Sequence, residues 1–127
     1  MTTKFGMTHI ALGIAAEHRD DNVAGNALWP LMPIDNAATR NWGPDKMSTI
    51  EQWRTPDIYL DAAMQILTTT PADFTGRAVT DEQLLRERGW IEEQLDSYWL
   101  TGQRPESPIW LDGRGSANTG RSATPAW

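Results

Sequence analysis

The chain contains no cysteine among its 127 residues. Disulfide bonds, thiolate catalysis and cysteine-based zinc sites are therefore all excluded. The lack of cysteine fits a reducing compartment. No N-terminal signal-peptide pattern and no C-terminal address motif is present, so a cytoplasmic location is the expectation.

Long apolar runs and clusters of positive charge are also lacking. No apolar run approaches the roughly 20 residues that a membrane span needs. The chain has 11 Lys and Arg against 17 Asp and Glu, a net charge of −6, and its basic residues are scattered singly. Because affinity for nucleic acids comes from clustered Lys and Arg, a nucleic-acid-binding surface is not expected.

The usual signatures of metal sites and hydrolytic sites are missing as well. His9 and His18 lie nine residues apart, which is not a metal-ligand spacing, so no metal site is predicted. Ser48 has no nearby base to activate it as a nucleophile. The Gly-rich residues 112–116 are not predicted to bind phosphate, because no strand precedes them and no helix follows.

The first third of the chain predicts a helix followed by a strand. Residues 2–18 form a broad apolar sector at helical spacing, wide enough to be covered on two sides. Residues 23–28 show almost no alternation of polar and apolar residues, which is typical of a parallel strand buried on both faces. Pro30 ends the strand, because proline cannot donate a hydrogen bond to the ladder.

The middle of the chain predicts a second helix and a second strand. Residues 31–54 are expected to be irregular apart from a short helical piece at residues 35–40, and a connection of this length is typical of a lid or binding loop. The Thr-Pro-Asp of residues 55–57 predicts the start of a helix that runs to about Leu67. Residues 77–80 predict the strand.

Two further helices and a tail complete the prediction. Asp81 is predicted to cap a helix that stops at Gly89, and residues 90–100 predict another helix. The residues that follow are rich in Gly, Pro, Ser and Arg, as in loosely ordered segments. The predicted organisation is one domain over residues 1–100 and a tail over residues 101–127.

Two strands joined by a helix form a βαβ unit with a parallel pair, and two strands are too few for a sheet that stands alone. A strand at residues 23–28 that is apolar on both faces would leave one edge and much of its surface uncovered. We therefore expect material outside this chain to complete the sheet.

Four short motifs resemble one family. They are Lys4-Phe-Gly-Met7, Ala27-Leu-Trp-Pro30, Asp61-Ala-Ala-Met-Gln-Ile-Leu67 and Phe74-Thr-Gly76. Over roughly residues 2–100 the chain resembles the short-chain dehydrogenase/reductases, and most closely their hydroxysteroid dehydrogenase-like and citronellol dehydrogenase-like branch. The resemblance implies an α/β fold: the C-terminal portion of a Rossmann-like, doubly wound parallel sheet, with the last two strands and their helices, incomplete alone.

The resemblance also implies a cofactor, NAD or NADP, and a hydride transfer to or from an alcohol or carbonyl substrate. Lys4 matches the family's active-site lysine, which binds the nicotinamide ribose and lowers the pKa of a catalytic tyrosine. Pro30 and Leu31 match positions that border the nicotinamide ring, with Leu31 in place of a common glycine. Ile34 matches the position whose backbone holds the carboxamide, and Asn36 replaces a threonine or serine that reaches the carboxamide or pyrophosphate.

An apolar substrate is expected from the large side chains of the predicted pocket, Trp29, Met32, Trp42 and Met47. The family's tyrosine is expected four residues before Lys4, one position upstream of Met1. Its Gly-rich phosphate turn, and the residue that selects NAD or NADP, belong to the first half of the fold and are not found here. The chain alone is therefore predicted to be inactive.

Two functional hypotheses follow. In the first, the chain is half of an oxidoreductase that works with a complementary N-terminal half. In the second, it is a non-catalytic remnant that docks to another dehydrogenase subunit or to itself. A homo-oligomer is expected under either hypothesis. A third possibility, an independent small binding domain, requires the strand at residues 23–28 to be covered from within the chain.

Overall fold

The structure is a computed structural model that describes residues 2–42 and 50–105. The chain divides into two compact units. The first, here called the sheet unit, consists of Met1–Trp29 and Tyr59–Gly89, and the second, the loop unit, consists of Pro30–Ile58 and Trp90–Trp127.

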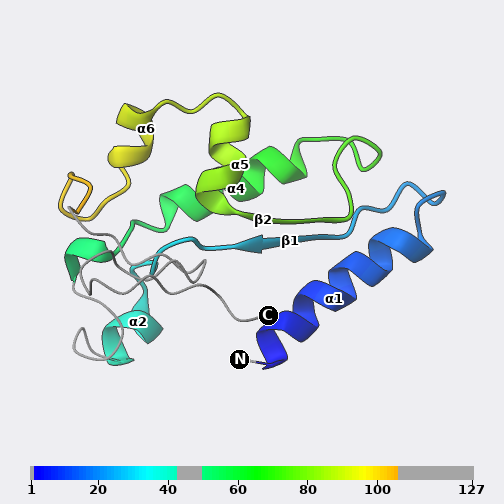
Figure 1. The fold of residues 1–127 in the computed structure, drawn as a ribbon, viewed down its shortest axis with the longest axis horizontal. Helices are drawn as coiled ribbons and strands as arrows, with labels where there is room; N and C mark the ends of the chain where they lie inside the picture. The colour runs from blue at the N-terminus through cyan, green and yellow to red at the C-terminus, as the bar shows by residue number, and fades with distance from the viewer. Residues whose placement is uncertain (1, 43–49, 106–127) are drawn as a thin grey trace, which may run out of the picture. The chain divides into compact units, whose positions relative to one another are not determined.

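The sheet unit contains the predicted βαβ arrangement. Helix α1 (Thr2–Glu17) precedes strand β1 (Asn26–Trp29), and helix α4 (Asp57–Leu67) leads to strand β2 (Arg77–Thr80) (Figure 1). The two strands pair in parallel as a two-stranded sheet, with Asn26 opposite Arg77 and Trp29 opposite Thr80. The predicted α/β fold with a parallel pair is therefore confirmed.

The side chain of Asn26 extends the pairing of the two strands. Its Nδ2 donates to the carbonyl oxygen of Phe74 at 2.9 Å, and its Oδ1 accepts from the backbone N–H of Arg77 at 3.1 Å. Just before it, the N–H of Gly25 donates to Thr75 Oγ1 at 3.1 Å. The one polar residue of the predicted strand thus fixes the register at which the strands begin to pair.

Helix α1 contacts both ends of β1. A Cβ atom on Gly25 would lie 2.1 Å from the carbonyl oxygen of Ala11 and 2.9 Å from the nitrogen of Ala15, so only glycine permits this approach. At the other end, Trp29 Nε1 donates to Thr8 Oγ1 at 3.0 Å, and the Trp29 ring lies 5.7 Å from the Phe5 ring between centroids.

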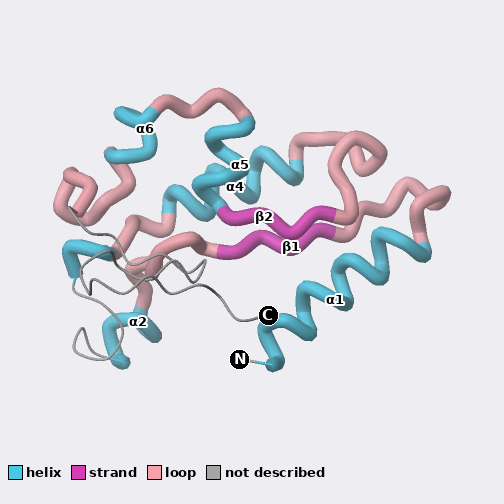
Figure 2. The backbone as a smooth tube through the Cα atoms, viewed as in Figure 1, coloured by secondary structure: helices cyan, strands magenta, loops and turns pink. Residues whose placement is uncertain are grey.

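Helix α4 contacts β1 through a polar group. The Tyr59 hydroxyl donates to the carbonyl oxygen of Leu28 at 3.0 Å. In the view of Figure 2, α1 and α4 lie to either side of the paired strands. The core of the sheet unit also contains Ala62, Phe74, Val79, Leu84 and Leu85, none of which is more than 4% exposed.

The loop unit is built around Arg54. This residue forms a parallel bridge with Ile34 and an antiparallel bridge with Trp99. Its guanidinium carbon lies 4.2 Å from the centroid of the Trp99 ring, and Arg54 is only 1% exposed. Short helices complete the described part of this unit: α2 (Ala37–Trp42), the 3₁₀ helix η1 (Ile50–Gln52) and α6 (Glu92–Asp96).

Strand β1 and helix α2 differ from the prediction at their ends. Strand β1 spans Asn26–Trp29 and not residues 23–28, because pairing with β2 starts at Asn26, and Val23 remains 42% exposed. Helix α2 spans Ala37–Trp42 and not residues 35–40, because the Asn36 side chain accepts a hydrogen bond from the backbone of the helix at this point.

The two helices after β2 also differ from the prediction. Thr80, and not Asp81, is the N-cap of α5 (Asp81–Glu87), since its Oγ1 accepts from the N–H of Gln83. The predicted helix at residues 90–100 is reduced to α6, because the chain after it turns to form the bridge of Trp99 with Arg54.

Residues 106–127, most of the predicted tail, lie outside the described residues, so the division near residue 100 stays a prediction. Within residues 2–42 and 50–105, no helix combines the length and the apolar character that crossing a membrane requires.

Candidate functional site

In open parallel α/β sheets, ligands bind beyond the carboxyl ends of the strands. Strand β1 ends at Trp29, and the chain continues into residues 30–36, here called the bridge segment. The predicted cofactor-binding residues other than Lys4 all lie in this segment. The bridge segment is therefore the candidate binding segment of the chain.

The bridge with Arg54 determines which way the Ile34 peptide groups point. The N–H of Arg54 donates to the Pro33 carbonyl oxygen at 2.9 Å, and the N–H of Asp35 donates to the Arg54 carbonyl oxygen at 2.8 Å. In a parallel bridge of this pattern, the N–H and C=O of the intervening residue point to the opposite side. Ile34 therefore directs one donor and one acceptor away from Arg54, as binding of a primary amide requires.

Two side chains of the loop unit already donate hydrogen bonds to the Ile34 carbonyl oxygen. The Ile34 carbonyl oxygen accepts from Asn36 Nδ2 at 3.0 Å and from Thr39 Oγ1 at 2.8 Å. Asn36 Oδ1 in turn accepts from the N–H of Thr39 at 3.0 Å. Asn36 thus caps α2 and folds back on Ile34, so a ligand at the Ile34 carbonyl would share it with these two donors.

Asp35, the residue after Ile34 in the bridge segment, forms an ion pair with Arg40 of α2. Arg40 donates to Asp35 through Nε at 2.5 Å and through Nη2 at 2.6 Å, a bidentate geometry. These hydrogen bonds from Arg40 hold the pKa of the Asp35 carboxyl below its ordinary value. The carboxylate therefore stays ionised at neutral pH, and the first turn of α2 keeps its geometry beside Ile34.

Lys4 lies in the first turn of α1, in the sheet unit, and its side chain is exposed. The next residue, Phe5, contacts the Trp29 ring, and Thr8 accepts the hydrogen bond of the Trp29 indole. The turn that carries Lys4 is thus attached to the carboxyl end of β1. Trp29, a predicted pocket residue, is engaged with α1 and half-buried.

The other predicted site residues fall in the loop unit. Pro30 and Leu31 are half-buried, and Met32 is fully buried. The side chain of Trp42 and all of Met47 lie outside the described residues. The predicted site residues thus form two groups. One group is Lys4 and Trp29 in the sheet unit, and the other is the bridge segment in the loop unit. The roles of both groups in binding stay predictions.

Sequence reasoning missed three residues that shape these groups. Thr39 lies three residues after Asn36, and this spacing, which is typical of a helix N-cap, was the available signal. Thr8 gave no signal, because a threonine within an apolar helix is not informative by itself. Tyr59 gave no signal beyond its place in the helix predicted from residue 57 to Leu67, yet its hydroxyl donates to the Leu28 carbonyl near the carboxyl end of β1. Burial, and after it the charge of Asp81, raises the pKa of the Tyr59 phenol.

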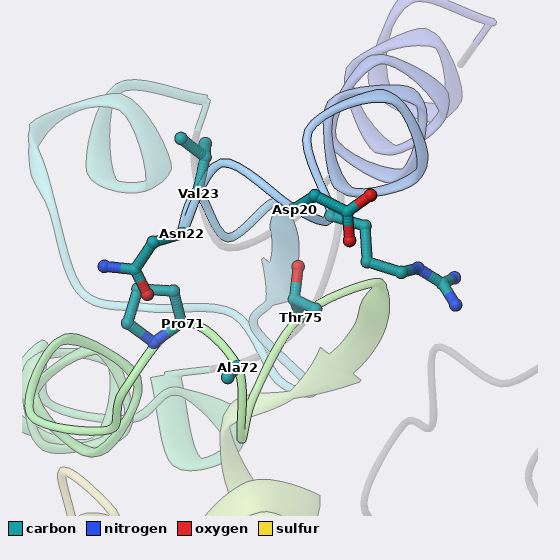
Figure 3. A pocket seen from close by; sticks show the side chains of 7 residues that line it. Asp20, Asn22, Val23, Pro71, Ala72 and Thr75 are labelled. Carbon is teal, nitrogen blue, oxygen red and sulfur yellow. The ribbon is translucent and has the colours of Figure 1, made fainter.

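A surface hollow of about 530 Å³ lies elsewhere in the sheet unit. Figure 3 shows its lining: Asn22 and Val23 come from the loop before β1, and Pro71, Ala72 and Thr75 come from the loop before β2. Both loops precede the strands, so the hollow lies at the amino ends of the sheet. That is the end opposite to the one where such sheets bind ligands, and we do not assign the hollow to the site.

No cluster of three or more His, Cys, Asp or Glu side chains suited to a metal ion occurs in the part of the chain that the structure describes. His18, one of the two histidines, is paired through Nδ1 with Asp21 at 2.8 Å on the exposed turn after α1.

Known proteins resemble this chain over most of its length. No family model matches it. Hydroxysteroid dehydrogenase-like protein 2 of Xenopus tropicalis is 42% identical over 105 residues, which cover 83% of this chain and 24% of that protein. The protein of the same name from Homo sapiens is 38% identical, again over 83% of this chain and 24% of the relative. The chain thus spans about a quarter of the length of these relatives.

Two solved structures share the fold. A short-chain dehydrogenase from Mycobacterium thermoresistibile is 38% identical with a TM-score of 0.62, covering 75% of this chain and 32% of that one. A protein from Xanthomonas campestris described as a dehydrogenase is 34% identical with a TM-score of 0.64, covering 75% and 33%. The Rossmann-like fold class is thereby confirmed, and so is the predicted resemblance: over most of its length this chain is a segment of the short-chain dehydrogenase/reductase family.

Proposed function

We propose that this chain supplies the lysine-bearing helix and the nicotinamide-binding segment of an NAD(P)-dependent dehydrogenase/reductase, and that it acts with a complementary part that carries the rest of the dinucleotide fold. The observation that carries the proposal is the likeness, at 38% identity, to a solved short-chain dehydrogenase over three quarters of the chain. The substrate class is an alcohol and its ketone or aldehyde with an apolar body.

The geometry of the bridge segment supports this role. The backbone of Ile34 directs a donor and an acceptor away from Arg54, and these groups match the carboxamide of a nicotinamide. A bound NAD or NADP supplies or accepts the hydride. In this proposal Ile34 orients the carboxamide, while Pro30 and Leu31 border the ring.

Lys4 has the second role. Its ammonium hydrogen-bonds the ribose, and its positive charge lowers the pKa of a tyrosine from the complementary part, which exchanges a proton with the substrate oxygen. The attachment of α1 to Trp29 supports this assignment, because it holds the turn of Lys4 at the carboxyl end of β1.

The test uses the chain alone and a chimera. The purified chain is expected to show no detectable NADH or NADPH binding, because the phosphate-binding turn is absent from its sequence. A chimera that places the upstream part of a hydroxysteroid dehydrogenase-like relative before this chain is expected to bind the cofactor and to turn over. Tight binding by the chain alone would show that the missing parts are wrongly assigned.

A pair of matched variants isolates Lys4 within the chimera. Lys4→Gln is expected to lower turnover at least about a hundredfold, the scale of a lost acid–base contribution. Arg19→Gln removes a cation from the opposite end of the sheet, at the hollow, and is expected to leave turnover unchanged. Equal losses in the two variants would refute the role of Lys4.

The exposed apolar stripes of α1 and α4 favour a second candidate function, a non-catalytic module that docks to a dehydrogenase subunit. The sequence immediately upstream of Met1 in the gene discriminates the two. A tyrosine codon directly before Met1, with a Gly-rich βαβ region further upstream, favours the enzyme, and the lack of both favours the docking module.

A further inference from the structure

The carbonyl oxygen of Ile34 has both of its acceptor positions filled by side chains of its own unit. Asn36 Nδ2 donates to this oxygen at 3.0 Å, and Thr39 Oγ1 donates to it at 2.8 Å. A backbone carbonyl oxygen has two lone pairs, so these two donors use its ordinary capacity. A third donor, from a ligand, could share the oxygen only with poorer geometry.

Both donors are themselves held in place. Asn36 Oδ1 accepts from the backbone N–H of Thr39 at 3.0 Å, so the Asn36 amide is bound at both of its ends. Thr39 is half-buried, and branching at Cβ restricts the rotation of a threonine side chain in a helix. A ligand would have to break two hydrogen bonds to displace Asn36, or to turn a restricted side chain to displace the Thr39 hydroxyl.

The N–H of the same peptide group is in the opposite condition. Within residues 2–42 and 50–105, no hydrogen-bond acceptor is bound to the Ile34 N–H. The bridge with Arg54 directs this N–H away from Arg54, on the side where the proposed function requires a ligand. Ile34 therefore offers a ligand an open donor beside an acceptor that is already taken.

We propose that Thr39, together with Asn36, sets the specificity of the nicotinamide-binding segment by closing the Ile34 carbonyl to the ligand. This inference rests on the proposed function and deepens it. Ile34 holds the carboxamide through its N–H alone, which donates to the carboxamide oxygen. The amino group of the carboxamide gains no hydrogen bond at Ile34. The segment therefore requires a carbonyl oxygen on the ring substituent and does not require the amino group.

Two cofactor analogues separate the two halves of the carboxamide. The 3-acetylpyridine dinucleotide keeps the carbonyl oxygen and has a methyl group in place of the amino group. The thionicotinamide dinucleotide keeps the amino group and has sulfur, a weak acceptor, in place of the oxygen. Competition with the bound reduced cofactor, followed by its fluorescence in the chimera with a relative's upstream part, measures each dissociation constant without turnover.

The expected order of affinities follows from the open donor and the closed acceptor. The acetyl analogue is expected to bind within about threefold of the nicotinamide dinucleotide, because it loses no hydrogen bond at Ile34. The thio analogue is expected to bind at least about fivefold more weakly than the nicotinamide dinucleotide, because the bond from the Ile34 N–H is weakened.

A pair of matched variants isolates the Thr39 hydroxyl. Thr39→Val keeps the shape of the side chain and the backbone N–H that Asn36 binds, but it removes one donor from the Ile34 carbonyl. The preference for the nicotinamide dinucleotide over the acetyl analogue is expected to rise at least about fivefold, because a lone pair opens to the amino group. Thr39→Ser keeps the hydroxyl and is expected to keep the wild-type preference. Comparing variants cancels the difference in ring electronics between the two analogues.

NMR of the chain alone reports on the same hydrogen bonds without a cofactor. The carbonyl carbon resonance of Ile34 is expected to move in Thr39→Val, because the oxygen loses a donor, and to stay close to its wild-type position in Thr39→Ser. An Ile34 resonance that ignores Thr39→Val would show that the hydroxyl does not occupy the carbonyl, and the proposal would be overturned.

Two binding results would also overturn the proposal, and they separate it from the proposed function. A wild-type chimera that prefers the nicotinamide dinucleotide over the acetyl analogue as strongly as Thr39→Val does would show that the Ile34 carbonyl already binds the amino group. The proposed function would then stand and the closed acceptor would not. A folded chimera that binds none of the dinucleotides would refute the proposed function, and this inference with it.

Discussion

The contact of helix α1 at Gly25 and the contact of helix α4 at Leu28 depend on different physical effects. Helix α1 meets the chain before β1 through direct backbone contact, with Gly25 against Ala11 and Ala15. Helix α4 binds the strand through one phenol hydrogen bond, from Tyr59 to the Leu28 carbonyl. A contact of the first kind depends on volume and tolerates no added atom. A contact of the second kind depends on a proton and therefore on pH.

The largest expected effect tests the steric contact. Gly25→Ala is expected to destabilise the chain by about 3 kcal/mol, because the new methyl group meets backbone atoms that cannot rotate away. Urea unfolding followed by far-UV circular dichroism measures the change. Gly13→Ala is the control: its Cβ enters open space, so it is expected to stabilise α1 by up to about 1 kcal/mol at low protein concentration. If both variants had the same effect, the close contact of α1 would be absent in solution.

The next effect tests the polar contact of α4. Tyr59→Phe is expected to lower the free energy of unfolding by about 1 kcal/mol at neutral pH, because one hydrogen bond is lost. Burial raises the pKa of Tyr59 above its ordinary value of 10.0. The unfolded chain therefore ionises first, so this stability is complete below pH 10 and is lost as the pH rises through the raised pKa.

Unfolding of both proteins between pH 8 and pH 11 measures the dependence on pH. The difference in stability between wild type and Tyr59→Phe is expected to shrink toward the alkaline end of this range. A difference that stays constant or widens would contradict the assignment of the raised pKa to Tyr59.

A smaller effect is expected at the carboxyl end of β1. Thr8→Val keeps the size of the side chain but removes the acceptor of the Trp29 indole, at an expected cost of about 0.5–1 kcal/mol. The indole N–H resonance of Trp29, assigned with a Trp29→Phe variant, is expected to shift in the NMR spectrum. Thr3→Val, at an exposed position of the same helix, should leave that resonance unmoved.

The smallest effect tests the outer side of α4. Leu60→Gln lies at a position that is 58% exposed, and its effect on monomer stability is expected to stay within about 0.5 kcal/mol. Thermal unfolding at low protein concentration is sufficient to measure it. A cost above 1 kcal/mol would mean that Leu60 is covered in solution and that the attachment of α4 extends beyond Tyr59 and its buried neighbours.

The sequence predicted the order of elements because local signals mark them. Pro30 follows the last residue of the strand, and the Thr-Pro-Asp of residues 55–57 marks the start of α4. Boundaries failed where a distant partner decides them. Strand β1 begins at Asn26 because Arg77 pairs there, and the predicted helix after residue 96 gives way to the bridge between Trp99 and Arg54.

The candidate site was predictable to a similar degree. Lys4 and Ile34 were predicted from motifs that resemble a family, and their roles stay predictions, while Ile34 does direct its peptide groups away from Arg54. The hydrogen bonds of Thr8 and Thr39 join residues whose meeting depends on how helices and loops fold. No local pattern could have assigned a partner to Thr8, 21 residues from Trp29.

The hydrogen bonds of the Asn26 side-chain amide affect which changes in loop length this chain can tolerate. The amide closes a ring of about fifty residues, since its partners Phe74 and Arg77 lie 48 and 51 positions further along. The entropy of closing a flexible ring grows only with the logarithm of its length, about 0.6 kcal/mol for each doubling. Insertions and deletions between residues 36 and 54 therefore leave the alignment of the strands almost untouched. The length of that part of the crossover can thus vary while Asn26 keeps the two strands aligned.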